Sequence, residues 1–412
     1  LRNFKTKNTN DEDENFALFQ AIYLPSWNRL SHPARKLLFC VSLFSPNSGG
    51  DFEALTAISN ITVEVAQSCI RDLWRVSFLE IRQKQNGIED KRYLLHTLTH
   101  YFVRSQQDVF ASSSSMAEEG GTHATSSPAQ AVMLHFTEYF SRYLQQHQHD
   151  YQELDIEQEN LFESLRYRIA QADVSLMHDV ILLVPYALTR GFYRQIKEAL
   201  EIAIQIAEIS ATVDELATLH LQLGTVLMKQ GQIENAVLLF SKGIENYQKI
   251  QDQTLACDLF CTLAEAESER GDFDIANHYL KQSIEIAQRI QAQQQYGRAL
   301  LLQGRVAIFS SQPELAKVYL SQALTVADAL QDEYLRAMVV RNLSTVAGMT
   351  SDFEMAEQYS RSLLEYAEQK RHRELIGVAL RNLSGSLAMR GEIEQAERYA
   401  RRGLEIAKEI GN

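Results

Sequence analysis

The sequence predicts a mostly α-helical chain in which a small winged-helix domain is followed by an α-solenoid of helical hairpins. Similar stretches recur every 40 residues, so that RNLS stands at 341–344 and again at 381–384. Glycine and proline are scarce, with 18 and 6 copies in 412 residues. This scarcity favours helices over turn-rich β structure. The first hundred residues have the pattern of three helices followed by a β-hairpin.

The N-terminal residues contain the cap and turn signals of a winged-helix domain, which we expect at 16–104. Residues 1–15 are polar, include the acidic run DEDE, and are expected to be a flexible lead-in. LSHPARKLLFCVSLF has Ser31 as a helix cap and Pro33 in the first turn, and Asp51 opens a shorter helix. TVEVAQSCIRDLWRVS follows as the third helix. FLEIRQ and RYLLH flank KQNGIEDK, whose Asn-Gly pair predicts a hairpin turn.

A winged helix often places its third helix in the major groove of DNA. Here that helix carries Arg71 and Arg75 but also Glu64 and Asp72. Basic and acidic residues are nearly balanced over the first 110 positions, so the basic surface of a DNA-binding domain is missing. The sequence therefore disfavours nucleic acid as a partner.

Two segments connect this domain to the repeats. Residues 105–128 are rich in Ser and Gly and predict a flexible linker. Residues 129–170 predict a helical joint made of two amphipathic stretches, the second of which contains Glu157, Asn160 and Leu161. Two histidines in LQQHQHD are too few ligands for a metal site, so no metal is predicted.

Residues 171–412 predict six units of one template. Each unit has two apolar stretches of helical period, separated by a Gly or Ser that fits the left-handed residue ending a helix. The turn residues are Gly191, Gly231, Gly271, Ser311, Ser351 and Gly391. Small residues that permit close helix packing precede and follow these turns: Gly224, Ala264, Gly304, Ser344, Ser384, Ala236, Ala276, Ala316, Ala356 and Ala396. The first unit departs from the template at Val184, Pro185 and Ile196. Because one hairpin cannot bury its apolar face alone, neighbouring units are expected to stack into a solenoid.

Composition and charge restrict the function further. The net charge of −13 disfavours wrapping of nucleic acid by the whole chain. The four cysteines form no CxxC pair and are expected to be buried thiols in a reducing compartment, which predicts a cytoplasmic location. No apolar run reaches about 18–20 residues, so no membrane span is predicted. The chain begins with Leu and has no signal peptide, which suggests a part of a longer protein.

The repeats resemble the tetratricopeptide family. The small residue, the turn Gly and the following Ala of that family all occur in LGTVLMKQGQIENAVLLF at 223–240. The usual period is about 34 residues. A spacing of 40 implies longer second helices, similar to the repeats of kinesin light chains and of bacterial signalling regulators. The Pro that usually ends each unit is missing.

The resemblance also implies a ligand groove, because in that family the first helix of each unit lines the concave face. The inward positions are acidic toward the start of the groove and basic toward its end. They are Asp258, Glu265, Glu269, Arg298, Arg305, Arg341, Asn342, Arg381 and Asn382. Arg offers forked donors to carboxylates and Asn can pair with an extended backbone, so a peptide or protein is the expected ligand. The alternative is that these residues form ion pairs between stacked units.

The N-terminal part resembles the winged helix that closes the nucleotide-binding module of NB-ARC-type (STAND) signalling ATPases. LSHPARKLLFCVSLF and RYLLHTLTHYFV carry this resemblance, and the Glu-x-x-Asn-Leu pattern of the joint is similar to that of bacterial members. In that family a Met-His-Asp-like motif follows the wing, and its His contacts the β-phosphate of ADP. Here the triplet is Leu95-His96-Thr97, so the resemblance implies a nucleotide-sensing role for His96. The alternative is a His that caps a helix or packs under the wing.

The chain is not expected to be an enzyme or to hold a cofactor, because it lacks GxxxxGK[ST], HExxH and GxSxG. The resemblance implies the regulatory and sensor region of a signal-transduction ATPase. ADP or ATP would then be bound by an upstream nucleotide-binding domain. The winged helix would help hold the off state, and the repeats would bind a peptide or protein. One alternative is a DNA-binding transcriptional regulator whose repeats bind a ligand. Another is an interaction scaffold without a switch.

Overall fold

The computed structural model describes residues 21–83, 91–106 and 128–409, and the fold is mostly helical. The chain divides into two compact units, Leu1–Ile206 and Ala207–Asn412. The lead-in at 1–15, most of the linker at 105–128 and most of the turn KQNGIEDK lie outside the described residues.

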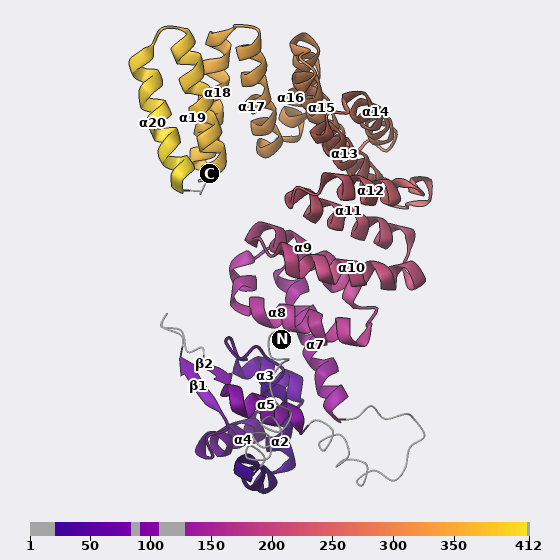
Figure 1. The fold of residues 1–412 in the computed structure, drawn as a ribbon, viewed down its shortest axis with the longest axis vertical. Coiled ribbons are helices and arrows are strands. Elements are labelled where there is room, and N and C mark those ends of the chain that lie inside the picture. Colours follow the sequence, from indigo (N-terminus) through magenta and orange to yellow (C-terminus); the bar gives the residue numbers. More distant parts are fainter. Residues whose placement is uncertain (1–20, 84–90, 107–127, 410–412) are drawn as a thin grey trace, which may run out of the picture. The chain divides into compact units, whose positions relative to one another are not determined.

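The first unit contains the three helices and the two strands predicted from its sequence (Figure 1). A helix at 21–29 precedes them, and another helix follows the second strand. The elements are α2 (His32–Val41), α3 (Phe52–Ser59), α4 (Val63–Arg75), β1 (Glu80–Gln83), β2 (Lys91–Leu94) and α5 (Thr97–Ser105). The two strands pair antiparallel, and a bridge joins Gly50 to Tyr93 beside them.

The caps expected in this part are present. The Ser31 hydroxyl accepts a hydrogen bond from the Ala34 amide at 3.4 Å, and Asp51 accepts one from the Ala54 amide at 2.7 Å. Each bond satisfies an amide that the first turn of a helix leaves without a partner. The capped helices bury a compact apolar core: Leu37, Leu38, Leu55, Ile58 and Leu73.

The joint and the first repeat complete this unit. The joint consists of α7 (Pro128–His147) and α8 (Tyr151–Gln171), and the repeat of α9 (Leu176–Arg190) and α10 (Tyr193–Ser210). Phe44, which follows α2, contacts Phe136 and Phe140 of α7 edge-on, with ring centroids 5.2 and 5.9 Å apart. The joint is therefore packed against the N-terminal helices although 21 undescribed residues, 107–127, separate them in sequence.

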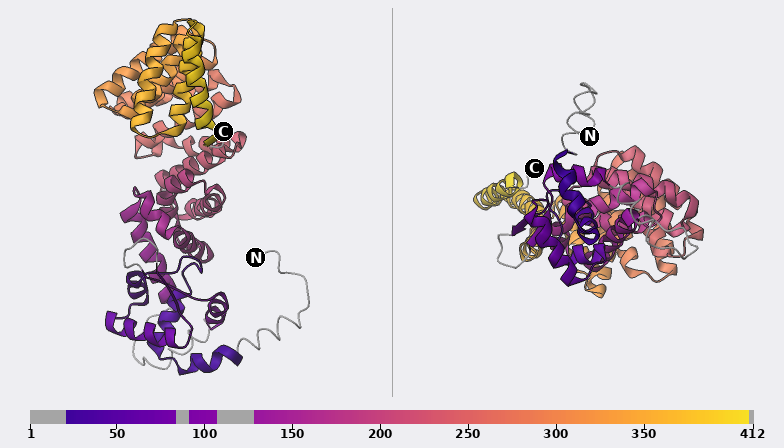
Figure 2. Two further views of the ribbon diagram at one scale, coloured as in Figure 1. Left: turned by 90° about the vertical axis from the view of Figure 1, so that its left-hand side faces the viewer. Right: turned by 90° about the horizontal axis from the view of Figure 1, so that it is seen from below.

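The second unit is a stack of helix pairs, which Figure 2 shows from two further directions. The helices are α11 (Val213–Lys229), α12 (Ile233–Ile244), α13 (Gln253–Arg270), α14 (Phe273–Arg289), α15 (Gln293–Phe309), α16 (Pro313–Leu330), α17 (Glu333–Met349), α18 (Phe353–Gln369), α19 (Arg373–Met389) and α20 (Ile393–Glu409). Only α12 is short, and a 3₁₀ turn at Tyr247–Lys249 follows it. The first helices of consecutive pairs contact one another, α11 with α13 and so on to α19, which places them on the inner side of the stack.

The residues that define the repeat act as predicted. All six turn positions have positive φ, from 57° at Ser311 to 90° at Gly271. The Ala that follows each turn by five positions is buried in every pair of the second unit. The four cysteines are free and buried, and burial raises the pKa of Cys261 to about 11. Within the described part of the chain, no helix is long and apolar enough to cross a membrane.

The helices are in close contact at the small residues of the repeat, so an added methyl group there is expected to lower the free energy of unfolding. A Cβ on Gly224 would lie 2.3 Å from Cε1 of Phe240, whose ring is fully buried. We expect Gly224→Ala to cost about 1–3 kcal/mol because the buried ring must shift. Gly348→Ala is the matched control, since nothing lies within 4 Å of its added Cβ. The control should stabilise α17 by up to about 1 kcal/mol. Denaturant unfolding followed by circular dichroism tests both, and equal stability of the two variants would contradict this packing.

Candidate ligand groove

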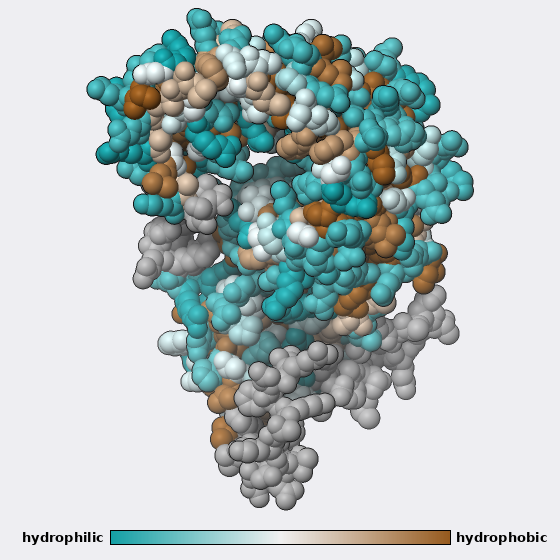
Figure 3. Space-filling model, turned by 45° about the horizontal axis from the view of Figure 1, so that its top comes forward, coloured by the Kyte–Doolittle hydropathy of each residue, from teal (hydrophilic) through white to brown (hydrophobic). Residues whose placement is uncertain are grey.

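The residues predicted to line a groove lie on the first helices of four consecutive pairs. α13 carries the acidic residues, and α15, α17 and α19 carry the basic ones and the asparagines. On the face of the repeats shown in Figure 3, hydrophobic residues are interspersed with hydrophilic ones. The surface in this view is therefore mixed in polarity.

A pocket of about 320 Å³ opens between α13, α15 and α17. It brings together five of the predicted residues: Glu265, Arg298, Arg305, Arg341 and Asn342. Its other walls include Leu301, Leu302, Tyr334, Leu335 and Met338, which sequence reasoning did not identify. Tyr334 and Met338 precede Arg341 by seven and three positions, which puts all three on one helical face. This spacing is the signal that could have found them.

Two ion pairs join α13 to α15 at this pocket. Arg298 Nη1 lies 2.8 Å from Asp258 Oδ1, and Arg305 Nη1 lies 2.5 Å from Glu265 Oε1. Burial raises the pKa of Asp258, and Arg298 opposes this shift. The alternative interpretation, ion pairs between stacked units, therefore holds for these four residues. Two of the three acidic residues at the start of the groove, Asp258 and Glu265, are thus neutralised by arginines of the next repeat.

Arg341 and Arg381 differ from these arginines. Among the described residues, no carboxylate forms an ion pair with either guanidinium group. Burial lowers the pKa of Arg341, and the positive charges of Arg305 and Arg381 lower it further, while Glu374 opposes them. A half-buried cation with like charges on both sides favours an anion that approaches from the solvent.

The asparagines and Glu269 are placed differently. Asn342 is only 8 % exposed, and its amide donates to the carbonyl oxygen of Met338 at 2.8 Å. Asn382 is partly exposed and donates to the Ser344 hydroxyl at 3.4 Å. Glu269 is exposed one turn beyond Glu265 and does not line the pocket. Pairing of the asparagines with a peptide backbone stays a prediction.

Arg381 lines a separate, wider pocket of about 520 Å³ between α19 and α20. Its walls are mainly small and apolar, and they combine Glu374, Gly377, Val378, Arg381 and Ser384 with Ala400, Gly403, Leu404 and Ala407. The two arginines for which the described residues offer no ion pair thus line different pockets, Arg341 among α13, α15 and α17 and Arg381 between α19 and α20.

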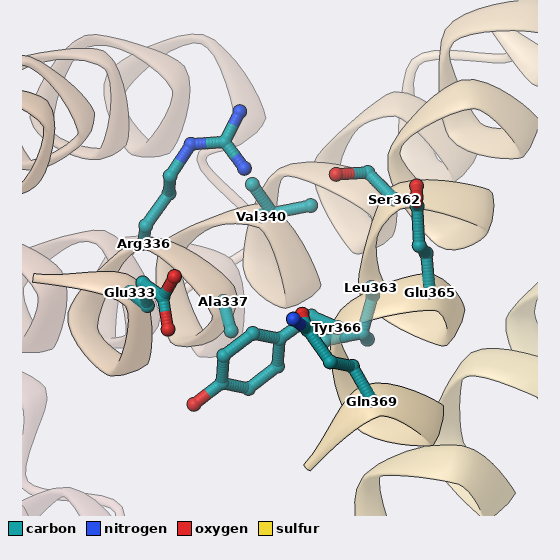
Figure 4. Close-up of a pocket in the computed structure, with 9 residues that line it drawn as sticks. All are labelled: Glu333, Arg336, Ala337, Val340, Ser362, Leu363, Glu365, Tyr366 and Gln369. Atoms are coloured by element: carbon teal, nitrogen blue, oxygen red, sulfur yellow. The ribbon is translucent and has the colours of Figure 1, made fainter.

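A further pocket of about 250 Å³ lies between α17 and α18 (Figure 4). Figure 4 shows the ring of Tyr366 pointing toward Ala337 and Glu333. Two of the three charged residues that line it have ion-pair partners, since Glu333 pairs with Lys370 at 2.7 Å and Arg336 with Asp328 at 3.1 Å. The third, Glu365, is exposed. This pocket is therefore a weaker candidate for binding a charged ligand.

His96 belongs to the first unit and lies apart from the groove in sequence. It is exposed and forms the N-cap of α5, where its Nδ1 accepts a hydrogen bond from the Leu98 amide at 3.4 Å. This is the helix-capping role that the sequence left open. Nucleotide sensing by His96 stays a prediction.

Comparison with known proteins identifies the repeats. A tetratricopeptide repeat family model matches residues 214–289. No curated protein matches the sequence significantly. A solved structure of a STAND ATPase with a tetratricopeptide repeat sensor, from Pyrococcus horikoshii, is similar over 99 % of this chain, with 17 % identity and a TM-score of 0.51. This chain covers 60 % of the length of the Pyrococcus chain.

Two other solved structures share the arrangement. Aspartyl phosphate phosphatase F from Bacillus subtilis is similar over 92 % of this chain and 94 % of its own, with 11 % identity and a TM-score of 0.52. A Rap protein complexed with Competence and Sporulation Factor is similar over 67 % of this chain and 77 % of its own, with 15 % identity and a TM-score of 0.50. At these identities the likeness establishes the fold, a helical solenoid of tetratricopeptide type.

Proposed function

We propose that this chain is the non-catalytic regulatory and sensor region of a STAND-type signal-transduction ATPase, and that its repeats bind a peptide or protein ligand. The observation that carries the ligand site is Arg341, a half-buried cation that lines a pocket and that forms no ion pair with any carboxylate in the described part of the chain. The likeness to the Pyrococcus STAND protein over 99 % of the chain supports the wider role. The Rap protein solved with a bound factor supports a ligand on a solenoid of this kind.

The chemistry of the groove favours an acidic peptide. Arg341 and Arg381 supply forked donors that match a carboxylate. Tyr334, Leu301 and Met338 supply apolar area beside Arg341. A carboxylate next to an apolar side chain, either within a peptide or at its C-terminus, satisfies both features.

In the proposed switch, the N-terminal part acts as a winged helix that helps hold the off state. An upstream nucleotide-binding domain would bind ADP or ATP, and the exposed His96 ring would face the bound nucleotide. The ligand shifts the equilibrium only to the extent that it binds the open form more tightly. Within this scheme the chain itself performs no catalysis and acts in the cytoplasm.

Binding of acidic and basic peptides of equal length to the purified chain tests the ligand site. We expect acidic peptides to bind and to protect the first helices α15, α17 and α19 from hydrogen exchange, because these helices carry the arginines. A duplex DNA probe at several salt concentrations is the companion measurement. Protection confined to second helices would overturn the groove. Tight DNA binding that weakens steeply with salt would favour the DNA-binding regulator instead.

A further inference from the structure

Three buried polar side chains meet where the hairpin contacts the joint. Arg92 lies on β2, and Glu157 and Asn160 lie on α8. Their exposed fractions are 6, 5 and 0 %. Charged residues are rarely buried to this degree unless they are paired. The cluster joins two segments that lie on either side of residues 107–127 in the sequence.

Glu157 is held by donors from both segments. Arg92 Nη2 donates to Glu157 Oε1 at 2.5 Å, and Asn160 Nδ2 donates to Glu157 Oε2 at 2.6 Å. Arg92 also donates to the carbonyl oxygen of Ile156 at 3.3 Å. Each carboxylate oxygen therefore has its own donor, and the orientation of the carboxylate is fixed relative to β2.

The side chain of Asn160 forms hydrogen bonds with backbone groups of the loop between α2 and α3. Its Oδ1 accepts a hydrogen bond from the Ser45 amide at 2.8 Å, and its Nδ2 donates to the Gly49 carbonyl at 2.9 Å. Gly49 has a φ of 61°, and a Cβ there would lie 2.5 Å from the Tyr93 carbonyl oxygen. The loop can therefore follow this path only with Gly at 49. Glu159 adds bonds from the hydroxyls of Ser45 and Ser48.

The free energy of burying this ion pair suggests that it does more than hold the two segments together. Burial raises the pKa of Glu157, whereas Arg92 and Asn160 oppose this shift. Burying an ion pair gains little over burying apolar side chains of similar size, and its best-attested use is to select one arrangement among several. The contact of Phe44 with Phe136 and Phe140 already holds the two parts together. The polar cluster adds directional bonds that the ring contacts lack.

α8 also carries contacts to the first repeat through a different residue. Asp155 Oδ1 accepts hydrogen bonds from Tyr186 at 2.8 Å and from Arg190 Nε at 2.9 Å, both on α9. One helix thus contacts the hairpin through Glu157 and α9 through Asp155. A rotation of α8 would therefore have to move both the hairpin and α9.

We propose that Glu157 and Asn160 form an orientation lock, which fixes the helix–hairpin part (residues 21–83 and 91–105) on α8 in one geometry. The lock passes a movement of α9 through α8 to the hairpin, and a movement of the hairpin back to α9. The lock rests on the proposed function in one respect: it would be the route by which ligand binding to the repeats changes the N-terminal part.

The test measures orientation rather than stability. Spin labels at two exposed positions, Ser68→Cys on α4 and Gln152→Cys on α8, report the distance between the two parts by electron double resonance. Arg92→Met with Glu157→Leu replaces the pair by apolar side chains. We expect one narrow distance in the parent protein and a broad or multiple distribution in this variant, because the ring contacts remain while the directional bonds are lost. Arg166→Met with Glu163→Leu removes an ion pair within α8, in which Arg166 is exposed and Glu163 is half-buried; this variant is the control and should keep the narrow distance.

A distribution that stays narrow in the Arg92→Met, Glu157→Leu variant would overturn the proposal. If that variant does not fold, Glu157→Gln replaces it, because the amide keeps only one acceptor for two donors. Hydrogen exchange at residues 45–49 and 92–94 should then be about tenfold faster, while α7 stays protected. Unchanged exchange would equally overturn the lock. Neither readout needs a ligand, so failure of the peptide-binding proposal would leave both measurements interpretable.

Discussion

Replacing Arg341 and Arg381 by glutamate is expected to abolish binding of an acidic peptide, with an affinity at least ~100-fold lower. A factor of about 100 corresponds to ~2.7 kcal/mol, within the range for removing one partner of a buried charge pair. The loss should be large because no described carboxylate forms an ion pair with either arginine and because both are replaced by repelling charges. Titration of a fluorescent acidic peptide measures the change.

A charge-matched control separates local from general electrostatics. Lys281→Glu with Arg401→Glu changes the net charge equally, but both positions are exposed on the second helices α14 and α20. We expect this control to bind nearly as well as the parent protein, with a small loss that disappears at higher salt. An equal loss of peptide affinity in both variants would show that only the overall charge matters, and would contradict a ligand site at Arg341 and Arg381.

The repeats were the most predictable part of the fold, because each defining residue has a local cause. Positive φ at Ser311 and Ser351 follows from the need to end a helix, which is visible in the spacing alone. Burial of Gly224 and Ala236 follows from the same register. By contrast, the helices at 21–29 and Thr97–Ser105 were not predicted, since short segments without a clear period depend on tertiary packing.

The site was predicted as a set of positions but not as a set of interactions. The sequence places Arg298 and Asp258 one repeat apart on one face, yet whether they pair or face a ligand depends on the side-chain conformations. The same limit applies to Glu157 and Asn160. Their spacing was recognised, whereas their partners, Arg92 and the backbone at 45–49, come from contacts across the linker.

Arg168→Met is expected to destabilise the first unit by about 3–5 kcal/mol, because it leaves an uncompensated buried charge. Arg168 Nε lies 2.6 Å from Asp179 Oδ2, and both residues are less than 5 % exposed. Without the guanidinium group, the one side-chain hydrogen bond that the described residues still give Asp179 comes from the Ser141 hydroxyl, which donates to its Oδ1 at 2.6 Å. Both tryptophans of the chain, Trp27 and Trp74, lie in the first unit, so fluorescence during denaturant unfolding reports its stability.

The direction in which the stability loss of Arg168→Met changes with pH tests whether the buried charge of Asp179 causes that loss. Burial already raises the pKa of Asp179, and removal of Arg168 should raise it further. The loss of stability should therefore be full at pH 7 and should shrink as the pH falls through the raised pKa, because protonation removes the buried charge. Adding Asp179→Asn to Arg168→Met should restore most of the stability at pH 7.

An exposed pair in the same unit provides the comparison. Arg190 pairs with Asp155 at 2.6 Å, but both side chains are more than one third exposed. Arg190→Met should therefore cost no more than about 1 kcal/mol and should show little dependence on pH. Similar losses of stability in Arg168→Met and Arg190→Met would show that the buried charge of Asp179 is not the cause. The apolar contacts between α8 and α9 would then have to account for the stability of their packing.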